Sequence, residues 1–155
     1  ISMALNELAH NPSLIKQLRT GKYWDTCADE FIRFASPTMH FRRTATQDYM
    51  LHGKTIREGD KVLLWFVSGS RDEEVFDQPH KIQLDRSPNR HLAFGQGGIH
   101  VCLGMNLSRK EMYTAFPIIL DRLKNMRFAE TNDFNYSPNV LLRGLDSLNI
   151  EFDKA

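Results

Sequence analysis

The sequence predicts a mainly α-helical fold with small β-hairpin regions. Apolar residues recur at the three-to-four spacing of amphipathic helices in residues 1–18, 25–34 and 103–124. Between residues 41 and 76, short β-branched and aromatic runs are separated by Gly or Gly-Asp turns, which is typical of hairpins. A chain of 155 residues with 41% hydrophobic content can form a sizeable core.

The first two predicted helices lie at the start of the chain. Ile1, Leu5 and Leu8 share one helical face. Asn11-Pro12 is a cap followed by a proline at the first helical position, so it predicts the start of a second helix. The apolar residues of that second helix are Leu14, Ile15 and Leu18.

The third predicted helix spans Asp25 to Phe34 and carries Glu30 and Arg33 on one face, three residues apart. Such a pair is most often a solvated ion pair that adds little stability. The Ser36-Pro37 that follows makes the pattern more specific.

The hairpin region begins at Phe41. Its signals are the run 41–48, the glycine turns at Gly53 and Gly59-Asp60, and an apolar strand over residues 62–67. The last part of the chain, Tyr136 to Phe152, ends in alternating apolar residues and predicts a final hairpin.

A glycine-rich run, Phe94 to Gly104, presents Cys102 directly before the helix predicted over residues 103–124. Glycines allow backbone conformations closed to other residues and let the chain lie flat against a large planar ligand. The free N–H groups and the dipole at a helix N-terminus stabilise a thiolate, the form of cysteine that binds metals. A buried structural cysteine is the competing interpretation.

Composition excludes several classes of function. The net charge of +1 argues against a nucleic-acid-binding protein or a polybasic membrane arm. Cys27 and Cys102 give neither a disulfide framework nor zinc-ligand spacing, which fits a reducing compartment. The longest apolar run, residues 62–67, is far too short to span a bilayer.

The run Phe94-Gly95-Gln96-Gly97-Gly98-Ile99-His100-Val101-Cys102-Leu103-Gly104 resembles the cysteine loop F-G-x-G-x-H-x-C-x-G of the cytochrome P450 monooxygenases, of the bacterial soluble type. The loop is one residue longer than usual and resembles that of bacterial members related to sterol and methyl-branched-lipid hydroxylases. The resemblance implies that Cys102 is the axial ligand of haem b iron and that His100 contacts a haem propionate. It assigns Phe94, Gly95, Gly97 and Gly104 to the haem-binding loop.

The hairpin region and the third helix agree with this resemblance. It assigns an arginine that reaches a haem propionate to the R-x-A-T segment, here Arg43 with Arg42 as the rival. Glu30 and Arg33 match the family's E-x-x-R pair. The third member of that network is Arg86 or Lys81, because the usual P-x-R-F appears here as Pro79-His80-Lys81-Ile82. We expect His91 to be a structural, hydrogen-bonded loop histidine.

By the same resemblance, residues 1–155 are the C-terminal haem-binding portion of a larger single-domain cytochrome P450. Their opening helix matches the end of the long helix on the distal side of the haem, and the part upstream is absent. We therefore expect exposed faces at Ile1, Leu5, Phe116 and Leu123, and an isolated chain that is unstable or poor in haem. The tip at Val140 and Leu141 would contact substrate, although plain packing is an equal alternative.

The implied activity is a cytoplasmic monooxygenase that inserts one atom of O2 into a C–H bond of a small apolar substrate. Electron donation from the Cys102 thiolate to iron favours O–O cleavage. A ferredoxin or similar protein would supply electrons, and Arg109 and Lys110 either meet this acidic donor or form a solvated helix face. The resemblance favours a sterol or fatty lipid as substrate. Two alternatives are a haem-binding protein without turnover and a non-haem protein in which Cys102 is merely buried.

Overall fold

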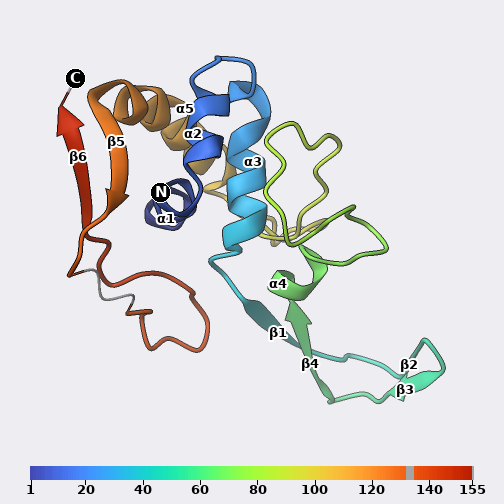
Figure 1. The fold of residues 1–155 in the computed structure, drawn as a ribbon. Coiled ribbons are helices and arrows are strands. Elements are labelled where there is room, and N and C mark those ends of the chain that lie inside the picture. Colours follow the sequence, from blue (N-terminus) through green and yellow to red (C-terminus); the bar gives the residue numbers. More distant parts are fainter. Residues whose placement is uncertain (132–134, 155) are drawn as a thin grey trace.

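The computed structural model describes residues 1–131 and 135–154, and its helices form one body from which a long hairpin projects (Figure 1). Helices from the start of the chain pack beside a long helix from its second half. The helices are α1 (Ser2–His10), α2 (Pro12–Leu18), α3 (Trp24–Ala35), α4 (Phe66–Gly69) and α5 (Met105–Arg122).

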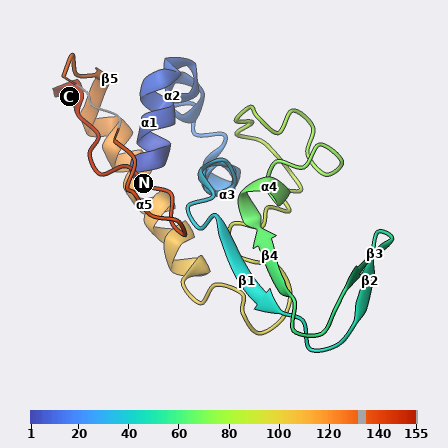
Figure 2. The ribbon, with the colours of Figure 1, turned by 90° about the horizontal axis from the view of Figure 1, so that it is seen from below.

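The strands form three separate antiparallel pairs, β1 with β4, β2 with β3, and β5 with β6. The two views show β2 and β3 at the tip of a projection that β1 and β4 begin (Figures 1 and 2). The strands are β1 (His40–Thr44), β2 (Tyr49–Leu51), β3 (Lys54–Ile56), β4 (Lys61–Trp65), β5 (Leu123–Phe128) and β6 (Ile150–Lys154).

Local signals account for the ends of the early helices. Asn11 caps α2 by accepting a hydrogen bond from the Ser13 N–H at 3.2 Å, with Pro12 at the first helical position. Helix α3 ends at Ala35, and its C-cap residue Ser36 has a left-handed φ of 38° and donates its hydroxyl to the Arg33 carbonyl at 2.7 Å. Both helices lie where the sequence predicts them.

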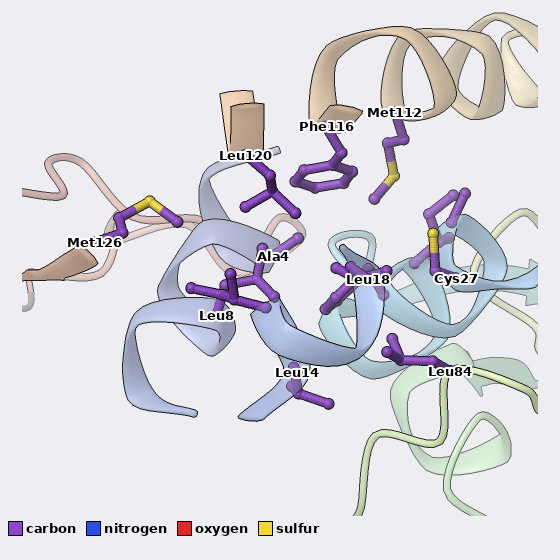
Figure 3. Close-up of a cluster of buried hydrophobic side chains, with 14 of the residues drawn as sticks. Ala4, Leu8, Leu14, Leu18, Cys27, Leu84, Met112, Phe116, Leu120 and Met126 are labelled. Atoms are coloured by element: carbon purple, nitrogen blue, oxygen red, sulfur yellow. The ribbon is translucent and has the colours of Figure 1, made fainter. Parts of the chain in front are cut away.

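The hydrophobic core lies between α1, α2, α3 and α5 (Figure 3). Leu8 and Leu18 are completely buried there, and Phe116 extends from α5 toward them. The expectation of an exposed Phe116 was therefore wrong, because α5 turns this face onto the N-terminal helices. Leu5 also packs against the core, whereas Ile1 is half exposed.

The hairpin region agrees with the prediction except at its end. The apolar run 62–67 was predicted as one strand, but β4 stops at Trp65 and Phe66 begins the short helix α4. Phe66 is buried and packs edge-on against Phe41, at a centroid distance of 5.6 Å. The chain therefore turns into a helix at Phe66, where this side chain becomes buried, and does not continue as a strand.

The predicted final hairpin over 136–152 was only partly right. Strand β6 pairs with β5, directly after α5, while Tyr136 and Leu145 form an isolated bridge. The helix predicted to reach Lys124 accordingly ends at Arg122. Met126 on β5 is buried against the core, so the segment after Arg122 buries an apolar side chain in the extended conformation.

Candidate functional site

The loop before α5 presents Cys102 beside the N-terminus of that helix. The Cys102 N–H donates to the Phe94 carbonyl at 2.9 Å, which closes the loop at its base. Gly95, Gly97 and Gly98 have φ of 69°, 72° and 76°. Residues other than glycine rarely adopt these backbone angles, so the path of the loop requires glycine at these positions.

Gly104, the N-cap residue of α5, lies close to the thiol. A Cβ built on Gly104 would lie 3.9 Å from the Cys102 Sγ. The first N–H groups of an α-helix have no partner within the helix, and the positive end of the helix dipole lies at the same terminus. The thiol is therefore next to the N-terminus of α5.

The two cysteines of the chain differ in environment. Burial raises the pKa of the Cys27 thiol to about 12, which keeps it protonated at neutral pH. Cys102 is exposed. Of the two cysteines, only Cys102 is thus accessible to a metal ion.

Beside Cys102 lies a hollow of about 480 Å³ between the cysteine loop and the β1–β4 hairpin. Ligand sites commonly have volumes of about 300–1,000 Å³. The β1–β4 side of the hollow combines apolar side chains with Arg43, and the loop side combines glycine backbone with the thiol. Its lining residues are Thr38, Phe41, Arg43, Leu64, Phe66, residues 93–100 and Cys102.

Strand alternation separates the two candidate arginines. Phe41 and Arg43 point to the same face of β1, because side chains two residues apart share a face. Both line the hollow, whereas its lining residues do not include Arg42. His100, Gly95 and Gly97 also lie at the hollow.

A buried ion-pair network joins α3 to the segment that precedes the cysteine loop. The Arg33 Nε donates to Glu30 Oε2 at 2.8 Å, and its Nη2 donates to Glu30 Oε1 at 2.8 Å. The Arg86 Nε donates to the same carboxylate at 3.0 Å. The Glu30 and Arg33 side chains are fully buried, so this pair is not the solvated ion pair that the spacing alone would suggest.

The network also orders the irregular segment before the cysteine loop. Arg33 donates to the carbonyls of Ser70, Pro79 and Lys81, at 2.8 to 3.0 Å. Of the two residues considered for third member, Arg86 contributes its guanidinium, whereas Lys81 contributes this backbone carbonyl.

Glu30 is the acceptor around which that segment folds. It accepts from the Gln83 N–H at 2.8 Å and the Asn89 amide at 3.0 Å. Burial acts to raise the pKa of Glu30, but the hydrogen bonds from Arg33 and Gln83 outweigh it and hold the pKa below its usual value. Glu30 is therefore a carboxylate at neutral pH.

A second cluster, which the sequence did not predict, lies beside the first. Asp29 Oδ1 is 2.8 Å from the Arg109 Nε and 3.2 Å from the His91 Nε2. His91 is buried and hydrogen-bonded, as expected, while Arg109 turns inward from the start of α5. We call these three residues the Asp29 cluster. No local pattern indicates it, since the partners lie 62 and 80 residues away from Asp29.

The C-terminal segment reaches the edge of the hollow. The Met39 N–H donates to the Leu141 carbonyl at 2.9 Å, and Leu142 forms a bridge with Thr38. Thr38 lines the hollow, whereas the Val140 side chain is 83% exposed. The tip therefore borders the hollow through backbone contacts.

Two negative findings apply to residues 1–131 and 135–154. Within them, no group of three or more His, Cys, Asp or Glu side chains is arranged to hold a metal ion. None of the helices described has the length and apolar character needed to cross a bilayer.

Comparison with known proteins matches residues 1–143 to the family model described as Cytochrome P450. The methyl-branched lipid omega-hydroxylase of Mycobacterium tuberculosis is 50% identical over 91 residues, covering 59% of this chain and 21% of the relative. The linalool 8-monooxygenase of Pseudomonas putida is 36% identical over 143 residues, covering 92% of this chain and 32% of the relative.

Solved structures agree with the sequence relatives. CYP109E1 of Bacillus megaterium, in complex with testosterone, superposes with a TM-score of 0.91 at 31% identity. That alignment covers 97% of this chain and 42% of the other. The chain thus spans well under half the length of the proteins it matches.

Proposed function

Because the chain belongs to the cytochrome P450 family, whose cofactor is haem b, we propose that it carries the haem-thiolate centre of a monooxygenase. The observation that supports this most directly is Cys102, an exposed thiol at a helix N-terminus and on the wall of a partly apolar hollow. The whole protein would insert one oxygen atom into a C–H bond of an apolar substrate.

The residues at the hollow fit a haem. A haem-thiolate centre needs one protein thiolate. An apolar surface for the macrocycle and a cation for a propionate would complete the site. Cys102, the aromatic and aliphatic side chains of the β1–β4 hairpin, and Arg43 supply these at one hollow. The cofactor brings most of the iron ligands itself, so a cluster of several protein ligands is not required.

Each residue of the site has a proposed role. Cys102 would hold the haem iron through its sulfur, Arg43 and His100 would bind propionates, and the backbone from Phe94 to Gly104 would surround the sulfur. Glu30, Arg33 and Arg86 fix the segment that leads into the loop. When bound, haem supplies the reductive activation of O2, in which one atom enters the substrate and the other leaves as water.

We propose a sterol or fatty lipid as the substrate class, with Val140 and Leu141 near it. The relatives named above are called a methyl-branched lipid hydroxylase and a linalool monooxygenase, and one solved relative is a testosterone complex. All three names refer to largely apolar molecules.

The remaining parts of the proposal concern the whole protein. Residues 1–155 are proposed as the C-terminal haem-binding portion of a longer single-domain chain, in line with the coverage of its relatives. We propose a ferredoxin or similar protein as electron donor. Two cysteines without a disulfide fit a location in the cytoplasm.

The test is the carbon monoxide difference spectrum of the reduced, haem-reconstituted protein. It compares this chain, a chain extended upstream, and Cys102→Ser and Cys27→Ser variants of both. A strongly red-shifted Soret band that is lost in Cys102→Ser and kept in Cys27→Ser is the expected result. Absence of the band from both unmodified chains would refute the haem-thiolate site.

Turnover separates the proposal from a haem-binding protein without activity. The extended chain, given an electron donor and O2, should oxidise a sterol or fatty lipid. A thiolate band without oxidation of any apolar substrate tested would favour the alternative.

A further inference from the structure

Helix α3 holds both ends of the cysteine loop through one carboxylate. His91 lies before the loop and Arg109 lies after it, seven residues beyond Cys102. Both side chains converge on the same oxygen, Asp29 Oδ1. The two ends of the glycine-rich segment are therefore joined through a residue of a different element.

Hydrogen bonding fixes the orientation of the His91 ring. Its Nδ1 accepts from the Ala93 N–H at 3.2 Å, so the ring proton sits on Nε2 and is donated to Asp29. The His91 side chain is only 3% exposed, whereas Asp29 and Arg109 are about one-quarter exposed. This ring cannot rotate without the loss of both bonds.

The cluster reaches Cys102 through Phe94. The Phe94 ring contacts both other members of the cluster, with its centroid 5.4 Å from the Arg109 guanidinium and 5.5 Å from the centroid of the His91 ring. The carbonyl of the same Phe94 accepts the Cys102 N–H at 2.9 Å. A continuous set of contacts thus runs from Asp29 to the backbone of Cys102.

We infer that Asp29 is a positioning residue for Cys102, and that it acts through His91, Arg109 and Phe94 rather than by contact with the cofactor. The inference rests on the proposed haem-thiolate function. It gives α3 two separate tasks: Glu30 orders the segment that leads into the loop, and Asp29 sets the geometry of the loop itself.

The experiment uses the haem-loaded protein expressed from its full coding sequence. Asp29→Asn keeps the shape of the side chain and removes its charge. Asp25→Asn is the matched control, since Asp25 is exposed one turn earlier on the same helix. The rate at which the red-shifted carbon monoxide band is lost in mild urea is measured together with helix content by circular dichroism.

Asp29→Asn should lose the thiolate band about tenfold faster than Asp25→Asn, because hydrogen bonds to a charged group are weakened. Helix content should stay unchanged while the band is lost, which a general loss of stability would not produce. His91→Gln should keep the band, since its amide can donate to Asp29 and accept from the Ala93 N–H. His91→Leu can do neither and should behave like Asp29→Asn.

Equal rates for Asp29→Asn and Asp25→Asn, with a normal band in the unmodified protein, would overturn this inference alone. Loss of the band only in step with helix content would overturn it as well. No thiolate band in the unmodified protein would overturn the proposed function and this inference with it.

Discussion

A Glu30→Gln substitution perturbs the buried network while it changes the size of the side chain very little. Glu30 is fully buried and accepts from Arg33 at 2.8 Å, Arg86 at 3.0 Å and the Gln83 N–H at 2.8 Å. An amide at this position offers one acceptor oxygen and turns an NH2 group toward the guanidinium groups. Arg33 is then a buried cation without its counter-charge.

The size of the effect follows from burial. Removal of one partner from a buried ion pair costs about 3–5 kcal/mol. The matched control is Glu151→Gln, because Arg127 and Glu151 lie 2.9 Å apart with both side chains about half exposed. An exposed pair contributes about 0.2–1 kcal/mol after solvent screening. The two pairs have nearly equal distances and differ in burial.

The assay is urea unfolding of the haem-loaded protein, followed by circular dichroism. Glu30→Gln should lower the urea midpoint by at least about 1 M, since urea slopes are about 1–3 kcal/mol per molar. Glu151→Gln should lower it only slightly. Glu30→Asp keeps the charge and provides a folded variant of intermediate stability if Glu30→Gln does not accumulate.

Equal midpoints for Glu30→Gln and Glu151→Gln would refute the reasoning. That result would mean that the buried pair adds no more stability than a solvated one. A domain of ordinary stability has about 5–15 kcal/mol in total, so the expected loss is a large part of it.

Three further predictions follow from the site. In the haem-free native protein, a thiol reagent should modify Cys102 and leave Cys27 unmodified until the chain unfolds, because burial raises the Cys27 pKa to about 12. Equal labelling rates of the two cysteines, measured by mass spectrometry, would contradict this prediction. Arg43→Gln should weaken haem retention about tenfold, because a charged hydrogen bond is lost, whereas Arg42→Gln should leave haem retention unchanged. The measurement is haem transfer to a scavenger protein, and weaker retention in Arg42→Gln alone would exchange the roles of the two arginines. The pKa of the Glu30 carboxyl is lowered in the folded state, so its contribution to the free energy of unfolding is fully present above the unfolded pKa of about 4.3. That contribution is lost as the pH falls through the folded pKa. Urea midpoints measured between pH 7 and pH 3 should therefore fall less steeply in Glu30→Gln than in the unmodified protein.

The sequence predicts best those features that depend on neighbours in the chain. The Asn11 cap, the i,i+3 pair of Glu30 and Arg33, and the glycines before Cys102 are all local signals, and the structure places the corresponding elements there. The choice between Arg86 and Lys81 stayed open because the segment that carries them has no periodic structure. Only the folded path shows that Arg86 turns its guanidinium toward Glu30.

Features that depend on distant packing were predicted poorly or not at all. Nothing between Trp65 and Phe66 signals a change from strand to helix, so the apolar run reads as one strand. The pairing of β6 with β5 is a tertiary choice that alternation within β6 cannot specify. The Asp29 cluster joins three segments of the chain. The local sequence around each of its residues indicates only an ordinary surface or loop position.

The bridge between Thr38 and Leu142 has a consequence for the order in which the protein is made. Because synthesis runs from the N-terminus to the C-terminus, Thr38 leaves the ribosome before Leu142, its partner in this bridge. The edge of the hollow at Thr38 therefore gains this backbone contact only after residue 142 has emerged, when the cysteine loop on the other side of the hollow has already been made.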